Sequence, residues 1–174
     1  LDSVGRNISE KEGSTLPLAL KLGRSVHDIA GKMLENKKDF LRLDDCRDTI
    51  ALHFQYINPR SESDWLSILL NNGVLRKDPN PDHKYSEDED LVRFSFQRFQ
   101  DFLMAEHSLN GLETAENLFD KEGVLGFCVE EGSFSWEWRG LIDALSVAIP
   151  EKFNLELGRV HTNLCIIAGW KLQR

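Results

Sequence analysis

The chain has 174 residues, 41% of them hydrophobic, and a formal net charge of −8. Such a chain can bury a core and typically forms one domain or two small ones. Its acidity argues against nucleic acid as a partner, and no run is apolar enough for a transmembrane helix. The three cysteines, Cys46, Cys128 and Cys165, form no C-x-x-C pair, so we expect reduced thiols in a cytoplasmic protein.

The first part of the chain predicts a tail followed by a helix. Residues 1–15 are polar and lack hydrophobic periodicity, so we expect a linker or tail. The chain starts at Leu1 without Met and shows no signal peptide, and we expect it to be a fragment of a larger protein. Leu18–Asn36 is predicted to be an amphipathic helix. Its apolar face comprises Leu22, Val26, Ile29, Met33 and Leu34.

Two further helices are predicted before residue 75. A short extended piece at Phe40–Leu41 precedes the second helix, which Asp44 or Asp45 would cap. Ser63–Asn72 is predicted to be the third helix, and Gly73 would end it because glycine tolerates the left-handed conformation. The buried stripe of the third helix comprises Trp65, Leu66, Leu69 and Leu70.

A two-stranded wing is predicted after these helices. Val74–Arg76 reads as a short strand, and Lys77–Asp90 as a hairpin tip because it contains prolines and an acidic run without apolar periodicity. Leu91–Phe96 would be the returning strand, with alternate residues on one face. Three helices followed by a two-stranded wing form the winged-helix arrangement, and we expect a mainly α-helical protein with this domain at residues 16–110.

The hydrophobic period changes immediately after the returning strand. Phe99, Phe102 and Leu103 fall at helical spacing, so a helix should follow at once. We expect the rings of Phe94, Phe96, Phe99 and Phe102 to pack in the core. Full burial of one such ring stabilises by about 1.5–3 kcal/mol before entropy is subtracted. A core role alone would also explain this aromatic motif.

The segment from Phe94 to Ala105 resembles the end of the winged-helix domain in STAND-type NTPases, the NACHT-like and bacterial antiviral signalling ATPases. Their motif runs roughly Phe-x-His-x-x-Phe-Gln-Glu-Phe/Tyr-Leu-Ala-Ala. This chain supplies Phe94 and then Phe99-Gln100-Asp101-Phe102-Leu103-Met104-Ala105. The resemblance is close over this segment and extends as a general layout over residues 16–110.

The resemblance implies a regulatory fragment of a signalling NTPase in bacterial antiviral defence, coupling nucleotide state to domain arrangement. It also implies an upstream NTPase domain of the same chain as partner, ATP or ADP with magnesium in the parent, and oligomerisation of the parent as an option. The sequence contains no phosphate-binding loop G-x-x-x-x-G-K-[ST], so we expect no catalytic activity and no bound cofactor in this fragment.

In this family, a histidine three residues before the motif phenylalanine contacts the nucleotide phosphate and helps to hold the inactive state. The corresponding residue is Phe96, and phenylalanine cannot donate that hydrogen bond. The resemblance thus makes Phe96 a nucleotide-facing candidate without the donor. Arg93 on the opposite strand face is a substitute candidate, and Arg98 is another. Ordinary core packing of Phe96 is the competing interpretation.

Two other function classes remain open. Winged helices often bind DNA, so one alternative is a DNA-binding transcriptional regulator, although the expected reading helix, Ser63–Asn72, has no Lys or Arg. The other alternative is a non-catalytic protein-interaction domain. No histidines occur at ligand spacing, so we expect no metal site. Cys46 and His53 could meet on one helix, but they lack an orienting third group for nucleophilic catalysis.

The sequence pattern changes after Leu109, and we expect an approximate domain boundary near Asn110. We expect residues 111–174 to form a helical domain of the superhelical type. Leu112–Leu118 and Gly140–Ala148 are predicted to be helices, and Pro150 is expected to end the second one.

Overall fold

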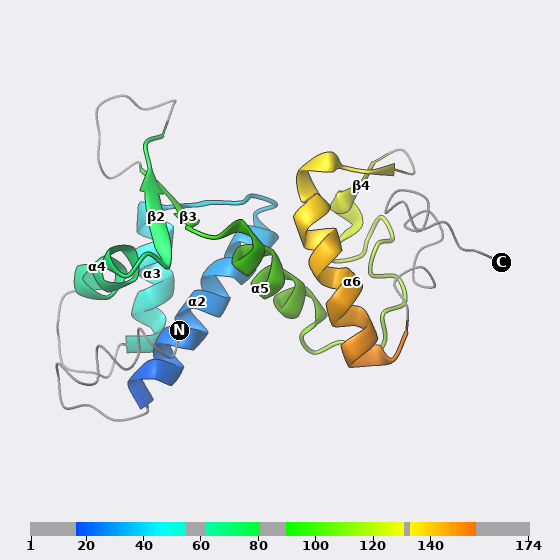
Figure 1. Cartoon of the computed structure of the whole chain (residues 1–174), viewed down its shortest axis with the longest axis horizontal. Helices are drawn as coiled ribbons and strands as arrows, with labels where there is room; N and C mark the ends of the chain where they lie inside the picture. The colour runs from blue at the N-terminus through cyan, green and yellow to red at the C-terminus, as the bar shows by residue number, and fades with distance from the viewer. Residues whose placement is uncertain (1–16, 55–61, 81–89, 131–132, 156–174) are drawn as a thin grey trace. The chain divides into compact units, whose positions relative to one another are not determined.

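The computed structural model describes residues 17–54, 62–80, 90–130 and 133–155 (Figure 1). Most of these residues are helical, and the strands form one three-stranded antiparallel sheet and one two-stranded sheet. The expected linker, residues 1–15, lies outside the described residues.

The chain divides into two compact units, Leu1–Phe96 (unit 1) and Gln97–Arg174 (unit 2). The sequence placed its boundary near Asn110. The helix that follows the third strand therefore groups with the second unit, not with the three preceding helices.

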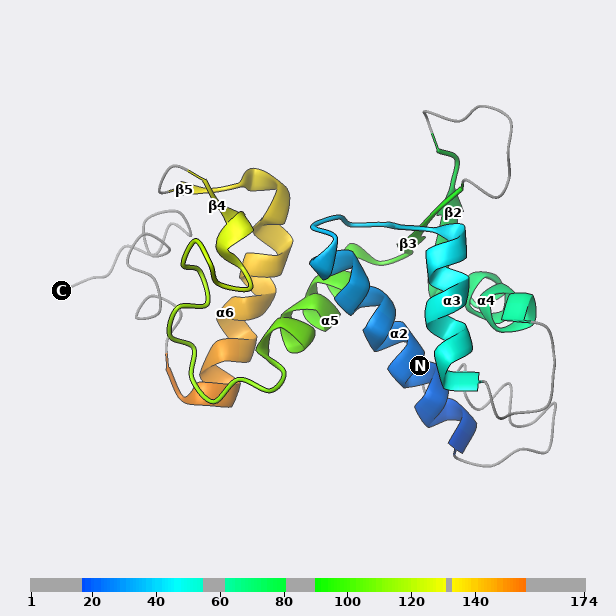
Figure 2. The same ribbon diagram turned by 180° about the vertical axis from the view of Figure 1, so that it is seen from behind.

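Unit 1 contains α2 (Pro17–Glu35), α3 (Leu43–Phe54) and α4 (Glu62–Asn71), with α2 and α3 packed side by side (Figure 2). The predicted amphipathic face of α2 is confirmed. Its members, Leu22, Val26, Ile29, Met33 and Leu34, are at most 3% exposed. Since α3 begins at Leu43, Asp44 and Asp45 lie in its first turn instead of capping it, where carboxylates complement the helix dipole.

The end of α4 follows the sequence prediction. Gly73 has a φ of 67°, the left-handed conformation that glycine adopts without steric cost. Its N–H donates to the Leu70 carbonyl and the N–H of Val74 donates to the Leu69 carbonyl, both at 3.0 Å. These two bonds satisfy carbonyls that would otherwise be unpaired at the end of the helix, and they turn the chain into the next strand.

The larger sheet joins β1 (Leu41–Arg42), β2 (Leu75–Asp78) and β3 (Leu91–Phe94) in the order β1-β3-β2, all antiparallel. Side chains alternate between its two faces. The face buried against the helices comprises Leu41, Leu75, Val92 and Phe94, each at most 2% exposed. The opposite face carries Arg42, Arg76, Asp78 and Arg93.

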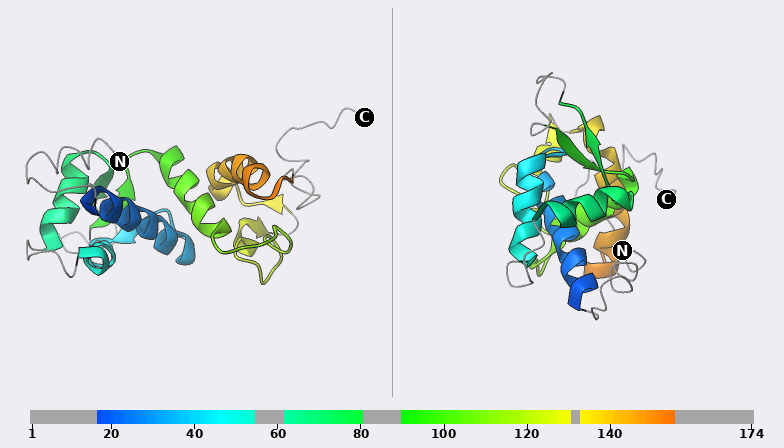
Figure 3. Two further views of the ribbon diagram at one scale, coloured as in Figure 1. Left: turned by 90° about the horizontal axis from the view of Figure 1, so that it is seen from below. Right: turned by 90° about the vertical axis from the view of Figure 1, so that its left-hand side faces the viewer.

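Unit 2 is built around a pair of packed helices (Figure 3). Its elements are α5 (Gln97–Leu109), the 3-10 helix Gly126–Cys128, β4 (Val129–Glu130), β5 (Ser133–Phe134), the 3-10 helix Trp136–Trp138 and α6 (Arg139–Phe153). In the part of the chain that is described, α6 is the one α-helix beyond residue 110. The expected superhelical stack is therefore not seen there.

One of the two helix predictions in unit 2 is wrong, and the other, Gly140–Ala148, is confirmed within α6 except for its expected end. Leu112–Leu118 is not helical: it contains a bend and the start of a turn, and Asn117 has a φ of 63°, a left-handed conformation that a right-handed helix cannot include. Pro150 lies inside α6, which continues to Phe153 and ends at Asn154, with a φ of 54°. A proline removes one N–H donor, and the helix accommodates this loss in its last turns.

A buried carboxylate joins α5 to α6. Asp101 is 6% exposed, and its Oδ1 accepts a hydrogen bond of 3.1 Å from Gln97 Nε2. Its other oxygen lies so close to Gly140 that a Cβ there would overlap it. Gly140 belongs to the first turn of α6, where free N–H groups and the helix dipole favour a negative charge. A side chain at position 140 would therefore force the Asp101 carboxylate to move.

We expect Gly140→Ala to lower the free energy of unfolding of unit 2 by roughly 1–3 kcal/mol, because the added methyl group must displace the Asp101 carboxylate. The matched control is Gly23→Ala in α2, where an added Cβ has open space and alanine favours the helix by up to about 1 kcal/mol. Urea unfolding followed by amide NMR signals reports each unit separately. Equal or greater stability of Gly140→Ala than wild type would contradict the contact.

Candidate functional site

The aromatic motif lies where the larger sheet ends and α5 begins. β3 ends at Phe94, Ser95 and Phe96 form a bend, and α5 starts at Gln97. The predicted junction of a strand with an immediately following helix is therefore confirmed. The strand is two residues shorter than the predicted Leu91–Phe96.

The four motif phenylalanines differ in their burial. Phe94 is 2% exposed and Phe99 is half-buried, whereas Phe102 is 43% exposed and Phe96 is 70% exposed. The expectation that all four rings pack in the core is wrong for Phe96 and Phe102.

The exposure of Phe96 follows from the bend. Regular alternation would return its ring to the buried face of Phe94, but the chain leaves the strand at Ser95. The N–H of Ser95 donates to the Val74 carbonyl at 3.0 Å, which anchors the bend to the residue before β2. Phe96 is therefore a surface ring carried on a segment that the sheet holds in place.

The exposure of Phe102 follows from the helical period of α5. The motif glutamine, Gln100, is 1% exposed and lies on the buried side of the helix with Leu103 and Met104. At 100° per residue, Phe102 lies roughly 200° around the helix from Gln100. The ring thus points away from the buried stripe.

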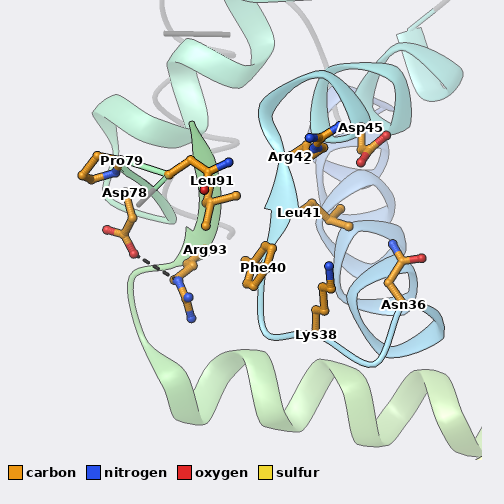
Figure 4. A pocket seen from close by; sticks show the side chains of 11 residues that line it. Asn36, Lys38, Phe40, Leu41, Arg42, Asp45, Asp78, Pro79, Leu91 and Arg93 are labelled. Atoms are coloured by element: carbon orange, nitrogen blue, oxygen red, sulfur yellow. Dashed lines mark ion pairs between the residues drawn. The ribbon is translucent and has the colours of Figure 1, made fainter. Parts of the chain in front are cut away.

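A pocket of about 600 Å³ lies in unit 1 on the open face of the larger sheet (Figure 4). Its lining comes from residues 36–45, from residues 78–80 and from Leu91 and Arg93 of β3. This volume is within the range of small-molecule sites.

Arg93 in the wall of this pocket is held by two carboxylates. Its Nη1 pairs with Asp39 Oδ2, and its Nε lies 3.1 Å from Asp78 Oδ2 (Figure 4). Its guanidinium carbon is 5.1 Å from the centroid of the Phe40 ring, within cation–π range. The charge of Arg93 is therefore balanced in place, and the side chain has a fixed orientation.

The structure does not bring the nucleotide-facing candidates together in this pocket. Arg93 lines it, but Phe96 is not among the lining residues. Arg98 is exposed on α5. A nucleotide contact by Phe96, Arg93 or Arg98 stays a prediction.

Three pocket residues were not identified as functional from the sequence. Lys38, Phe40 and Arg42 alternate as cation, aromatic ring and cation, the pattern of one face of an extended segment. That alternation was the available signal. The pairing of Arg42 with Leu91, which completes the pocket, joins segments distant in sequence.

The cations of the wing strands are neutralised within the wing. Arg76 Nη2 lies 3.4 Å from Asp78 Oδ2, and Lys77 Nζ lies 2.8 Å from Asp90 Oδ2. The helix α4, which would read DNA, contains no Lys or Arg. The described residues of α4 and of the wing strands therefore offer few unpaired cations to a DNA duplex, which disfavours DNA binding.

Cys46 and His53 of α3 do not form a reactive pair, and Cys128 of unit 2 is not reactive either. Burial, with a smaller contribution from the charge of Asp45, raises the pKa of the Cys46 thiol to about 12, and burial raises that of Cys128 to about 12. His53 Nε2 lies 2.7 Å from Asp28 Oδ2 of α2. Both thiols are protonated near neutral pH, so neither is a ready nucleophile.

Two other features are absent from the part of the chain that the structure describes. No group of three or more His, Cys, Asp or Glu among them could hold a metal ion. None of the described helices is long and apolar enough to span a bilayer.

No family model, curated protein or solved structure matches this chain.

We expect Phe94→Ala to lower the free energy of unfolding of unit 1 by about 3–5 kcal/mol, the usual cost of truncating a buried ring. Phe96→Ala removes the same atoms from a surface position and should change stability by less than about 0.5 kcal/mol. Urea unfolding followed by NMR signals of unit 1 measures both. Similar losses in the two variants would contradict the different placement of the two rings.

Proposed function

We propose that unit 1 is the winged-helix regulatory domain of a cytoplasmic STAND-type signalling NTPase, with a role in bacterial antiviral defence. In this proposal the domain couples the nucleotide state of an upstream NTPase domain to the arrangement of the parent protein. The observation that carries the proposal is the junction at which β3 passes through Phe96 into α5.

The order of elements supports the winged-helix assignment. Unit 1 runs α2-β1-α3-α4-β2-β3, and β1 pairs with β3 on the side opposite to β2. Three helices, a short strand between the first two and a β2–β3 hairpin occur in the order that a winged helix has, and this order supports the proposal.

The exposed ring at the junction supports a contact with another domain. Phe96 occupies the position where the family has its phosphate-contacting histidine, and 70% of its surface is accessible. Because phenylalanine offers no hydrogen-bond donor, we propose an apolar contact with the upstream domain. An anchored aromatic ring is well suited to such a contact, since little side-chain freedom is lost on binding.

The proposal assigns nucleotide chemistry to the parent and not to this chain. The sequence lacks a phosphate-binding loop, so ATP or ADP and magnesium would be held by the upstream domain. Unit 1 would then act as a rigid body that contacts this domain in one nucleotide state and leaves it in another.

The test is made in the parent protein, whose reading frame should encode a phosphate-binding loop upstream of Leu1. We expect Phe96→Ala to raise basal ATP hydrolysis about tenfold, which corresponds to roughly 1.4 kcal/mol of lost contact in the inactive state. The matched control, Trp136→Ala, removes another exposed ring, 77% accessible, and should leave the rate unchanged.

A parent without a phosphate-binding loop would contradict the assignment to NTPases. Equal rates for Phe96→Ala and wild type would contradict the proposed contact. Tight duplex binding by the present chain at moderate salt would instead favour the transcriptional regulator.

A further inference from the structure

Two exposed cations line the pocket on the open face of the larger sheet. Lys38 and Arg42 are exposed, line the pocket and have no carboxylate within ion-pair distance among the described residues. Lys38 Nζ instead lies 5.1 Å from the centroid of the Phe40 ring, and Figure 4 shows this ring between Lys38 and Arg93. Two positive charges thus border the pocket without an ion pair to any described residue.

Arg93 adds oriented donors to these two charges. A guanidinium has five N–H donors, and the contacts with Asp39 and Asp78 use Nη1 and Nε. Its side chain remains 26% exposed. The remaining donors are therefore held in a fixed direction by the two carboxylates, as recognition of a phosphate requires.

The formal charges around the pocket balance. Lys38, Arg42 and Arg93 stand against Asp45 and Asp78 of the lining and against Asp39, which pairs with Arg93. An anion would therefore be held by contacts with the two cations that form no ion pair with the described residues, Lys38 and Arg42, and not by a surplus of positive charge.

Part of the pocket lining is apolar. Leu91, which is 7% exposed, shares the open face of the sheet with Arg42, and Pro79 also lines the pocket. An uncharged organic group would cover these side chains, and the volume of about 600 Å³ leaves room for a molecule larger than a bare ion.

We propose that this pocket binds a small phosphate monoester with an apolar body. The dianionic phosphate matches the two cations that lack a described partner, Lys38 and Arg42, and Arg93 donates its remaining N–H groups. The apolar body lies over Leu91 and Pro79. The site does not depend on the NTPase assignment, since every residue in it belongs to unit 1.

The test uses the full 174-residue chain and phenyl phosphate as the probe, followed by amide NMR at pH 7.5 and low salt. We expect saturable shifts at residues 38–42 and 78–80 with sub-millimolar affinity. Inorganic phosphate should bind more weakly because it lacks the apolar body. Lowering the pH below about 6 should weaken binding, since the monoester then loses its second charge.

The double variant Lys38→Ala/Arg42→Ala should reduce the affinity at least tenfold. The matched control is Lys21→Ala/Arg24→Ala, which removes the same charge from α2, outside the pocket lining. Dispersed spectra of both variants report that unit 1 is folded. Shifts that grow linearly without saturation, or equal losses of affinity in the two double variants, would overturn the proposal.

Discussion

The pairing of β3 with both β1 and β2 is the interaction on which unit 1 depends. β3 is the central strand, so its register with Leu41–Arg42 and with Leu75–Asp78 decides which side chains meet the helices. In this register Val92 and Phe94 are buried. A slip of one residue would turn them to the solvent, and the loss of burial would oppose it.

The same register gives the sheet its second face. With Val92 and Phe94 turned inward, Arg93 must point outward, where Asp39 and Asp78 hold it beside Phe40. The core and the pocket are therefore two consequences of one set of backbone hydrogen bonds. The point at which strand pairing ends also determines the position of Phe96. The chain leaves the sheet at Ser95, and the Phe96 ring therefore stays on the surface. The proposed regulatory contact and the proposed anion site thus rest on one strand.

Local patterns in the sequence predicted much of unit 1, and long-range contacts account for what they missed. The apolar face of α2, the stop at Gly73 and the junction of β3 with α5 follow from periodicity and glycine chemistry within a few residues. The outward turn of Phe96 could not be predicted, because alternation does not reveal where a strand ends. The pocket needed the pairing of Arg42 with Leu91. In unit 2, the proximity of Asp101 to Gly140 likewise joins two helices that no local pattern connects.

The central claim is this register, and backbone nuclear Overhauser effects in the isotopically labelled chain test it most directly. The account predicts cross-strand contacts that pair Arg42 with Leu91 and Arg76 with Arg93. Contacts that instead pair Arg42 with Val92, or Arg76 with Phe94, would contradict it. Either result would exchange the two faces of the sheet, and with them the buried core and the pocket.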